Sequence, residues 1–202
     1  MGQYYQVVVG TKCGWDKRVY YPLDFDDGLK LMEHSYVDSD FCKKIHSLIY
    51  KKPMRLIWVG DYANEKTDEY YSMHNRNQEP KPKSIPKYSF VWGNKAFKHR
   101  SNDTALAGSD IDYENSYLVN HTIKGYLDMK NYYKHSSVNI WGVIDPLPIL
   151  TVVGNGRGGG DYYGSNENRV GSWKWHLISI EDNPPDGYTK LIAKNYSFVE
   201  GP

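Results

Sequence analysis

Clusters of glycine, proline, asparagine and aspartate divide this chain into short apolar runs. Such runs are typical of β-strands bounded by turns. They occupy residues 7–9, 18–21, 56–59, 117–121, 126–129, 138–143, 149–153, 175–180 and 188–192. The run Leu56-Ile57-Trp58-Val59 is continuously apolar, as expected for a strand that is buried on both faces. Because most connections between the runs lack a crossover helix, we expect a mostly antiparallel sheet.

Two helices are predicted near the amino terminus. The first spans about residues 29–36 and can be capped by Asp26 or Asp27. The second starts after Asp38 or Ser39 and stops before the proline at position 53. Its apolar positions form one stripe: Phe41, Ile45, Leu48 and Ile49. Its lysines are expected to point elsewhere or to lie near its carboxyl end: Lys43, Lys44, Lys51 and Lys52. A mostly antiparallel β-sheet with about two amino-terminal helices is an α+β fold.

The length of 202 residues favours a single domain over residues 1–202. Between about residues 64 and 115 the strand pattern gives way to polar, proline-rich sequence. We interpret this stretch as an irregular surface insertion. Its lysine-rich and aromatic segment, residues 81–100, could hold single-stranded nucleic acid, but a solvated insertion is the better interpretation.

The charge balance limits the classes of partner. Lys and Arg number 25 against 24 Asp and Glu, which leaves a formal net charge of +1 and no general attraction to nucleic acid or to anionic membranes. No stretch approaches the roughly 20 apolar residues that a membrane helix needs. The two cysteines do not make a disulfide framework, and no export signal is recognised. We therefore predict a cytoplasmic protein with no membrane partner, and a homo-oligomer is compatible with the sequence.

The most unusual segment is the glycine-rich stretch from Gly154 to Gly164, directly after an apolar run. It satisfies the G-x-G-x-x-G pattern of dinucleotide sites, but the residues that follow are poor helix formers, so that interpretation fails. Consecutive backbone N–H groups in unusual conformations can instead form an anion-binding nest. The ligand-binding residues predicted on this basis are Gly156, Arg157, Gly158, Gly159, Gly160, Asp161, Tyr162 and Asn120.

An alternative interpretation gives this segment no ligand. The glycines would then serve a long connection that needs positive φ, with Arg157 and Asp161 paired to backbone groups or to each other. Nearby aromatic residues have the same ambiguity. Trp173 and Trp175 could stack on a nucleobase-like ring or could simply belong to the core.

Four side chains are candidates for acid–base catalysis: His34, Asp61, His121 and Asp161. They lie at predicted strand ends, in loops or on the first helix, and carboxylates with imidazoles could supply a general base and a general acid. No local metal signature links any two of them, so no metal site and no resident cofactor are predicted; a divalent ion would enter only if the protein is a hydrolase. Taken alone, each of the four is better interpreted as a structural group.

Six motifs occur in a fixed order along the chain: Met1-Gly2-Gln3-Tyr4-Tyr5, Leu31-Met32-Glu33-His34-Ser35, Trp58-Val59-Gly60-Asp61-Tyr62-Ala63, Asn120-His121-Thr122, Pro146-Leu147-Pro148 and Gly154 to Tyr162. Together they resemble an uncharacterised family of small proteins from bacteriophages and gut bacteria. The resemblance covers most of the chain outside residues 64–115 and implies no established activity. It also implies a histidine before Pro146, where this chain has Asp145.

A phage setting implies a role against host defence, in the host cytoplasm, and three functions are compatible with it. The favoured hypothesis is a protein that sequesters a phosphate-bearing nucleotide signal at the glycine-rich segment. The second is a hydrolase or phosphodiesterase that degrades such a nucleotide. The third is an inhibitor that binds a host defence protein through a tyrosine-rich surface.

Overall fold

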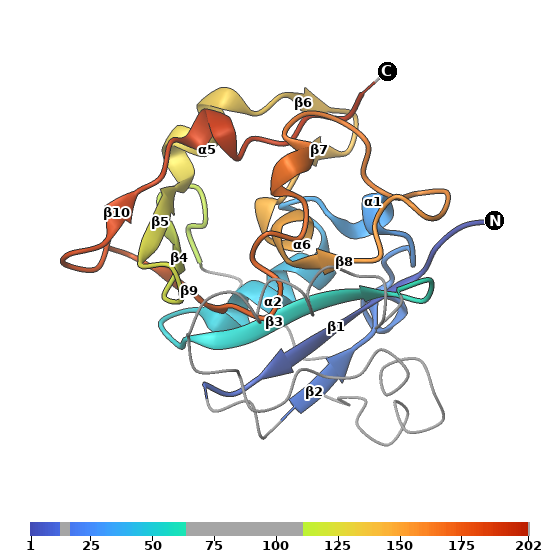
Figure 1. Cartoon of the computed structure of the whole chain (residues 1–202), viewed down its shortest axis with the longest axis horizontal. Helices are drawn as coiled ribbons and strands as arrows, with labels where there is room; N and C mark the ends of the chain where they lie inside the picture. Colours follow the sequence, from blue (N-terminus) through green and yellow to red (C-terminus); the bar gives the residue numbers. More distant parts are fainter. Residues whose placement is uncertain (13–16, 64–110, 202) are drawn as a thin grey trace.

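The computed structural model describes residues 1–12, 17–63 and 111–201, and Figure 1 shows their arrangement. Most of the predicted insertion at residues 64–115 therefore lies outside the described residues, as does the lysine-rich segment at 81–100. The described part is an α+β fold with one main, mostly antiparallel sheet, which confirms the predicted class.

Eight described strands form the main sheet, and seven of them follow the order β10-β5-β4-β9-β3-β1-β2. The eighth, β8, pairs with β3. Their bounds are β1 Tyr5–Gly10, β2 Lys17–Tyr20, β3 Met54–Gly60, β4 Tyr117–Asn120, β5 Gly125–Asp128, β8 Val152–Val153, β9 Leu177–Glu181 and β10 Thr189–Lys190. The β10–β5 and β3–β8 pairs are parallel, and the other neighbouring pairs are antiparallel.

Strand β3 is the centre of this sheet. One of its edges pairs with β1 from Arg55 to Gly60. Its other edge is shared, because β9 pairs with its first two residues and β8 pairs with Trp58 and Val59. The predicted double-sided burial is confirmed: Leu56 and Trp58 belong to the larger apolar cluster, while Ile57 and Val59 belong to the smaller one.

The helices lie mainly on the face of the sheet that carries the larger cluster. Figure 1 shows α1, α2 and α6 gathered on one side of β1 and β3. The α-helices of the described residues are α1 Leu31–His34, α2 Asp40–Ile49, α5 Met129–His135 and α6 Pro146–Thr151. Short 3-10 turns occur at Pro22–Phe25, Glu167–Arg169 and Ala193–Asn195. On the opposite face, Trp175 covers Val8 and Ile57.

Helix α2 confirms the predicted apolar stripe. Phe41, Ile45 and Ile49 are fully buried, and Ser39 caps the helix by accepting a hydrogen bond from the Cys42 N–H. Lys44, which was expected to point away from the stripe, is buried as well, with 1% of its surface exposed.

The strand predicted at residues 149–153 is wrong for most of its length. Residues 146–151 form α6, and only Val152 and Val153 are extended. The reason is local: Asp145 accepts a hydrogen bond from the Leu147 N–H, and Pro146 stands at the first helical position, where its fixed φ suits a helix. This capped start outweighs the strand preference of the β-branched residues that follow.

The run predicted at residues 138–143 is a separate small hairpin, with β6 at Val138–Asn139 and β7 at Gly142–Val143. Its tip is apolar and exposed: Val138, Ile140 and Trp141 have 74%, 91% and 68% of their surface accessible. No helix in the described part of the chain has the length and hydropathy to cross a membrane.

Candidate functional site

The glycine-rich segment after β8 is a compact loop, and three of its glycines require their conformational freedom. Gly154, Gly156 and Gly160 have φ values of 94°, 88° and 83°, in the region that side-chain-bearing residues rarely adopt. The segment does lead two successive N–H groups, those of Arg157 and Gly158, toward one point. The loop therefore has the form of an anion nest.

The anion in this nest is the carboxylate of Asp161. Its Oδ2 accepts hydrogen bonds from the N–H of Arg157 at 2.7 Å and of Gly158 at 2.9 Å. Its Oδ1 accepts the hydroxyl of Tyr5 at 2.6 Å, which ties the loop to β1. Burial and the carboxylates of Asp161 and Asp61 raise the pKa of Tyr5 far above its usual value. The arrangement matches the alternative interpretation of the segment, in which Asp161 is paired with backbone groups.

The remaining loop groups bind the first residues of the chain. The N–H of Gly159 donates to the Met1 carbonyl, and the Gly159 carbonyl accepts the Gln3 N–H, both at 3.1 Å. Gly158 has no space for a side chain, because a Cβ there would come within 2.7 Å of the Gln3 backbone nitrogen. The Arg157 guanidinium donates to the Tyr62 carbonyl at 2.7 Å.

Three aromatic residues near the loop are core residues. Tyr162, Trp173 and Trp175 are all almost fully buried. The Tyr162 hydroxyl donates to the Ser165 carbonyl, and its N–H donates to the Asn155 side chain. These three rings therefore present no free face on which a nucleobase could stack.

His34, on α1, occupies a structural position. It is fully buried, with Nδ1 2.8 Å from the Gly28 carbonyl and Nε2 3.2 Å from the Trp58 indole nitrogen. Nδ1 must carry the proton, because a carbonyl only accepts and an indole N–H only donates. Burial lowers the pKa of His34 to about 4. The contacts of both ring nitrogens thus require the neutral imidazole.

Asn120, His121 and their neighbours fasten the β4–β5 turn to β9. The Asn120 side chain accepts the N–H groups of Thr122 and Ile123 and lies 2.9 Å from His176 Nδ1. His121 contacts the Tyr188 hydroxyl through Nδ1 and the Ser179 hydroxyl through Nε2, at 3.0 and 2.8 Å. Burial lowers its pKa. Ser179 donates onward to Glu181 and is fully buried, so it is not placed as a nucleophile.

The four predicted catalytic residues do not form one site, although two of them lie near each other. Asp61 directly follows Gly60, the last residue of β3. Asp161 lies near the same end of the strand, because it accepts the hydroxyl of Tyr5, and Tyr5 pairs with Gly60. His121 bonds to Leu177, which pairs with Arg55 at the start of β3. The seven residues of β3 span roughly 20 Å, so His121 is far from both carboxylates. Within the described residues, no group of three His, Cys, Asp or Glu side chains is placed to hold a metal ion.

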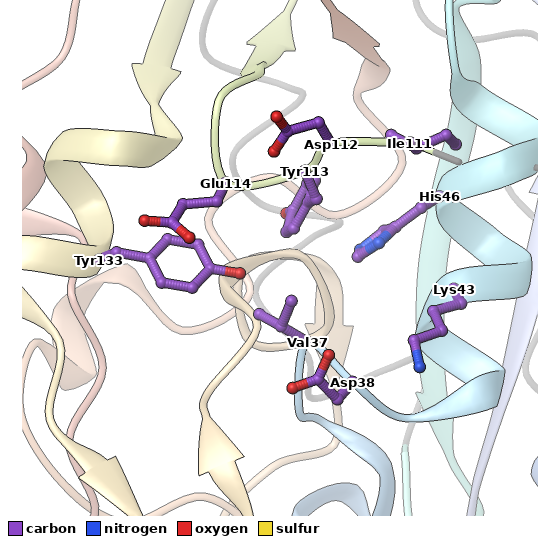
Figure 2. A pocket seen from close by; sticks show the side chains of 9 residues that line it. All are labelled: Val37, Asp38, Lys43, His46, Ile111, Asp112, Tyr113, Glu114 and Tyr133. Carbon is purple, nitrogen blue, oxygen red and sulfur yellow. The ribbon is translucent and has the colours of Figure 1, made fainter. Parts of the chain in front are cut away.

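A different part of the molecule has a pocket with reactive side chains, of about 300 Å³. It lies between α2, the segment before α2, residues 111–114 and α5. Figure 2 shows the residues that line it: Val37, Asp38, Lys43, His46, Ile111, Asp112, Tyr113, Glu114 and Tyr133. Its volume is at the lower limit for sites that take small organic molecules.

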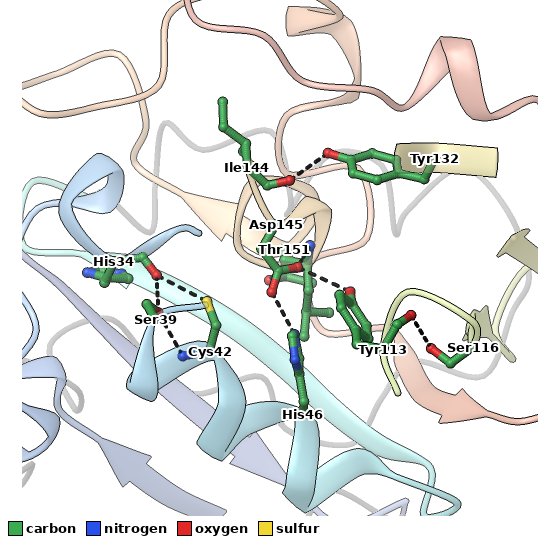
Figure 3. A network of polar contacts seen from close by, with 11 residues as sticks. His34, Ser39, Cys42, His46, Tyr113, Ser116, Tyr132, Ile144, Asp145 and Thr151 are labelled. Atoms are coloured by element: carbon green, nitrogen blue, oxygen red, sulfur yellow. Dashed lines mark hydrogen bonds and ion pairs between the residues drawn. The ribbon is translucent and has the colours of Figure 1, made fainter. Parts of the chain in front are cut away.

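His46 and Asp145 meet at the wall of this pocket. His46 Nε2 lies 2.6 Å from Asp145 Oδ2, with 4% and 0% of the two side chains exposed, and the contact is shown in Figure 3. The contact has the distance of an ion pair but not the angles of a hydrogen bond. Asp145 Oδ1 is held by the Leu147 N–H at 2.9 Å and by the Tyr113 hydroxyl at 3.2 Å.

The His46 ring is fixed by packing. It stacks on Tyr113, with ring centroids 4.0 Å apart and an angle of 26° between the planes. Nδ1, its other nitrogen, has no hydrogen-bond partner among the described residues, and the residue lines the pocket. The arrangement can hold the imidazole in one orientation at the pocket.

Cys42, one turn before His46, is not an activated nucleophile. Its thiol is buried and donates to the His34 carbonyl at 3.1 Å. Burial and the nearby Asp145 carboxylate raise the pKa of the Cys42 thiol, so the reactive thiolate is disfavoured. The described residues that line the pocket therefore offer acid–base groups rather than a cysteine nucleophile.

Sequence reasoning did not identify this site, because its partners are far apart in the chain. His46 was not among the predicted site residues, and Asp145 was named where the family resemblance implies a histidine. A usable signal was present: an aspartate immediately before a proline-led helix predicts a buried, oriented carboxylate.

Comparison of the chain with protein-family models, curated proteins and solved structures gives no match.

The hydrogen bond between Tyr5 and Asp161 should be worth a measurable amount of stability. We expect Tyr5→Phe to lower the free energy of unfolding by about 1.5 kcal/mol and Asp161→Asn by about 2 kcal/mol, because each leaves a buried polar partner poorly satisfied. A double-mutant cycle by urea denaturation should give a coupling energy of about 1 kcal/mol. Tyr163→Phe, at an exposed tyrosine of the same loop, is the control and should have little effect. Additive losses would contradict the assignment.

The buried His34 should make the protein less stable in acid. Its pKa is about 4 in the folded protein and 6.5 in the unfolded chain, so the unfolded chain binds more protons between these values. The free energy of unfolding should therefore fall, by at most about 3 kcal/mol, as the pH drops from 6.5 to 4. In His34→Gln, whose amide can keep both contacts without titrating, the decline should be shallower, while the two proteins should run parallel above pH 7. Equal slopes in acid would refute this role.

Proposed function

We propose that this protein is a hydrolase that acts on a small molecule in the pocket between α2 and residues 111–114, with His46 as its general base. The observation that carries the proposal is the contact of His46 Nε2 with Asp145 Oδ2, 2.6 Å apart, at the wall of an open pocket. The proposal retains the reaction class of the predicted hydrolase but assigns the chemistry to different residues.

The energetics of the pair support a functional role. Removing a carboxylate and an imidazole from water is costly, and a well-packed apolar pair of similar volume is often equally or more stabilising. Buried ionisable groups with a specific charge partner in a cleft are candidates for functional sites. A purely structural His–Asp pair would have no need of a neighbouring hollow of about 300 Å³.

The reaction follows from the two ring nitrogens. Asp145 orients the imidazole through Nε2, and Nδ1 takes a proton from a water molecule in the pocket. The water oxygen forms a bond to the electrophilic carbon or phosphorus of the substrate, and the bond to the leaving group breaks. The imidazolium, stabilised by Asp145, then returns the proton to the leaving group.

The sequestration hypothesis loses its main physical support at the glycine-rich loop. Of the amides that were expected to hold a phosphate, those of Arg157 and Gly158 bind Asp161 and that of Gly159 binds the Met1 carbonyl, while the Arg157 guanidinium is bonded to the Tyr62 carbonyl. The nucleotide ligand, the role against host defence and the host cytoplasm stay predictions, as does the homo-oligomer.

Substitution of His46 should abolish turnover without unfolding the protein. With a substrate found by mass-spectrometric screening of esters, amides and nucleotides, we expect His46→Ala to lower kcat by about 100-fold to 10,000-fold. Because this change leaves a space beside the pocket, added imidazole should restore part of the activity. His135→Gln, at an exposed histidine of α5, is the control.

Asp145→Asn keeps the acceptor for the Leu147 N–H and removes the charge beside His46. As a positioning residue, Asp145 should affect kcat much more than KM. An intact fold with unchanged kcat in both His46→Ala and Asp145→Asn would reject the proposal.

A separate observation favours the third hypothesis, binding to another protein. The β6–β7 hairpin exposes three apolar residues within a stretch of four, Val138, Ile140 and Trp141. Exposed tryptophans in apolar patches are frequent anchors of protein interfaces.

If the hairpin is such an anchor, capture of a host protein from a cell lysate should depend on its tip. We expect the double variant Ile140→Ser and Trp141→Ser to lose the captured protein while its melting temperature stays unchanged, since both side chains are already exposed. Ile192→Ser, at an exposed isoleucine outside the hairpin, serves as the control. Equal capture by all three proteins would exclude the hairpin as the interface.

A further inference from the structure

We propose that the pocket beside His46 selects a positively charged organic molecule, an amine or guanidine, and that Asp38 and Glu114 determine this preference. The inference takes the location of the site from the proposed function and adds the class of substrate. It departs from the predicted phosphate-bearing ligand, which would have the opposite charge.

The charged side chains around the opening carry the argument. Among the described residues that line the pocket, three carry carboxylates, Asp38, Asp112 and Glu114, and one carries an ammonium group, Lys43. Asp112 accepts two hydrogen bonds from Asn115, whereas the carboxylates of Asp38 and Glu114 pair with no described residue. Figure 2 shows both carboxylates at the edge of the pocket, on opposite sides of Val37. Two carboxylates that have no partner among the described residues thus line the pocket and can bind a ligand.

Two further features distinguish this site from an ordinary acidic surface. The pocket is a hollow of about 300 Å³, and the buried His46 reaches it with Nδ1 unpaired among the described residues. Its walls also include the rings of Tyr113 and Tyr133. Aromatic faces attract cations through their quadrupole, and this attraction adds to that of the carboxylates.

Carboxylates make the electrostatic potential at the pocket negative, which is the sign that favours a cation. Burial raises the pKa of the Tyr133 hydroxyl, and the carboxylates of Asp145, Asp38, Glu114 and Asp112 raise it further. The same negative potential that opposes a phenolate would oppose a phosphate and favour an ammonium group.

Three probes that share one ring and differ in charge provide the test: benzylammonium, benzyl alcohol and benzoate. Binding to the full chain is measured by calorimetry and by NMR shifts of pocket residues, at low and high salt. We expect benzylammonium to bind tightest and benzoate weakest, with the difference shrinking as salt screens the carboxylates. Adenosine monophosphate is added as the phosphate-bearing probe.

Charge-neutralising variants of the rim give the matched comparison. Asp38→Asn and Glu114→Gln should each weaken benzylammonium binding about threefold to fivefold, the size expected for partly exposed charges. Lys43→Gln should strengthen it by a similar factor. Asp186→Asn removes an acid from the β9–β10 loop, outside the pocket, and should change nothing.

The outcomes separate this inference from the proposed function. Cation binding that follows the rim charges, with no turnover of any ester or amide, would support the inference and reject the hydrolase. Turnover that depends on His46 but not on the charge of the substrate would do the reverse. Binding of the three ring probes with equal affinity, tighter binding of benzoate or adenosine monophosphate, or no binding of benzylammonium would overturn the inference.

Discussion

Strand β3 is removed from water on both faces, so each of its backbone hydrogen-bonding groups needs a partner within the protein. Strand β1 satisfies one edge, and β9 and β8 divide the other. This division brings three distant parts of the chain against one strand. The glycine-rich loop follows β8, the Asn120–Thr122 turn is fastened to β9, and α6 leads into β8. The position of every candidate site therefore depends on how β3 is covered.

Much of this arrangement is predictable from local patterns. A continuous apolar run identifies β3, and a spacing of three and four residues identifies the buried stripe of α2. The glycine-rich segment was also correctly expected to need unusual backbone conformations. The strand predicted at residues 149–153 was wrong because the helix cap and the proline before this run favour a helix more strongly than its β-branched residues favour a strand. In each of these cases the local sequence contained the relevant pattern, and the stronger of two competing patterns determined whether a helix or a strand formed.

The candidate functional residues were harder to predict, because a contact between residues far apart in the chain produces no periodic pattern in the sequence. His46 lies on α2 and Asp145 lies immediately before α6, so they meet only in the folded chain. The glycine-rich loop shows the opposite difficulty. Its signal for an anion is genuine, but the anion is Asp161, a few residues further along the same chain. A pattern of backbone donors therefore predicts that an acceptor will be present, and it does not reveal whether that acceptor is internal.

The burial of the Cys42 thiol has a practical consequence. It is a buried residue of α2, its thiol is bonded to the His34 carbonyl and its pKa is raised, so reagents that modify cysteine react with it only after α2 moves away from its neighbours. In a variant with Cys13 replaced, the rate of thiol labelling would report how often α2 detaches. Because α2 carries His46, that rate would also give the lifetime of the assembled pocket.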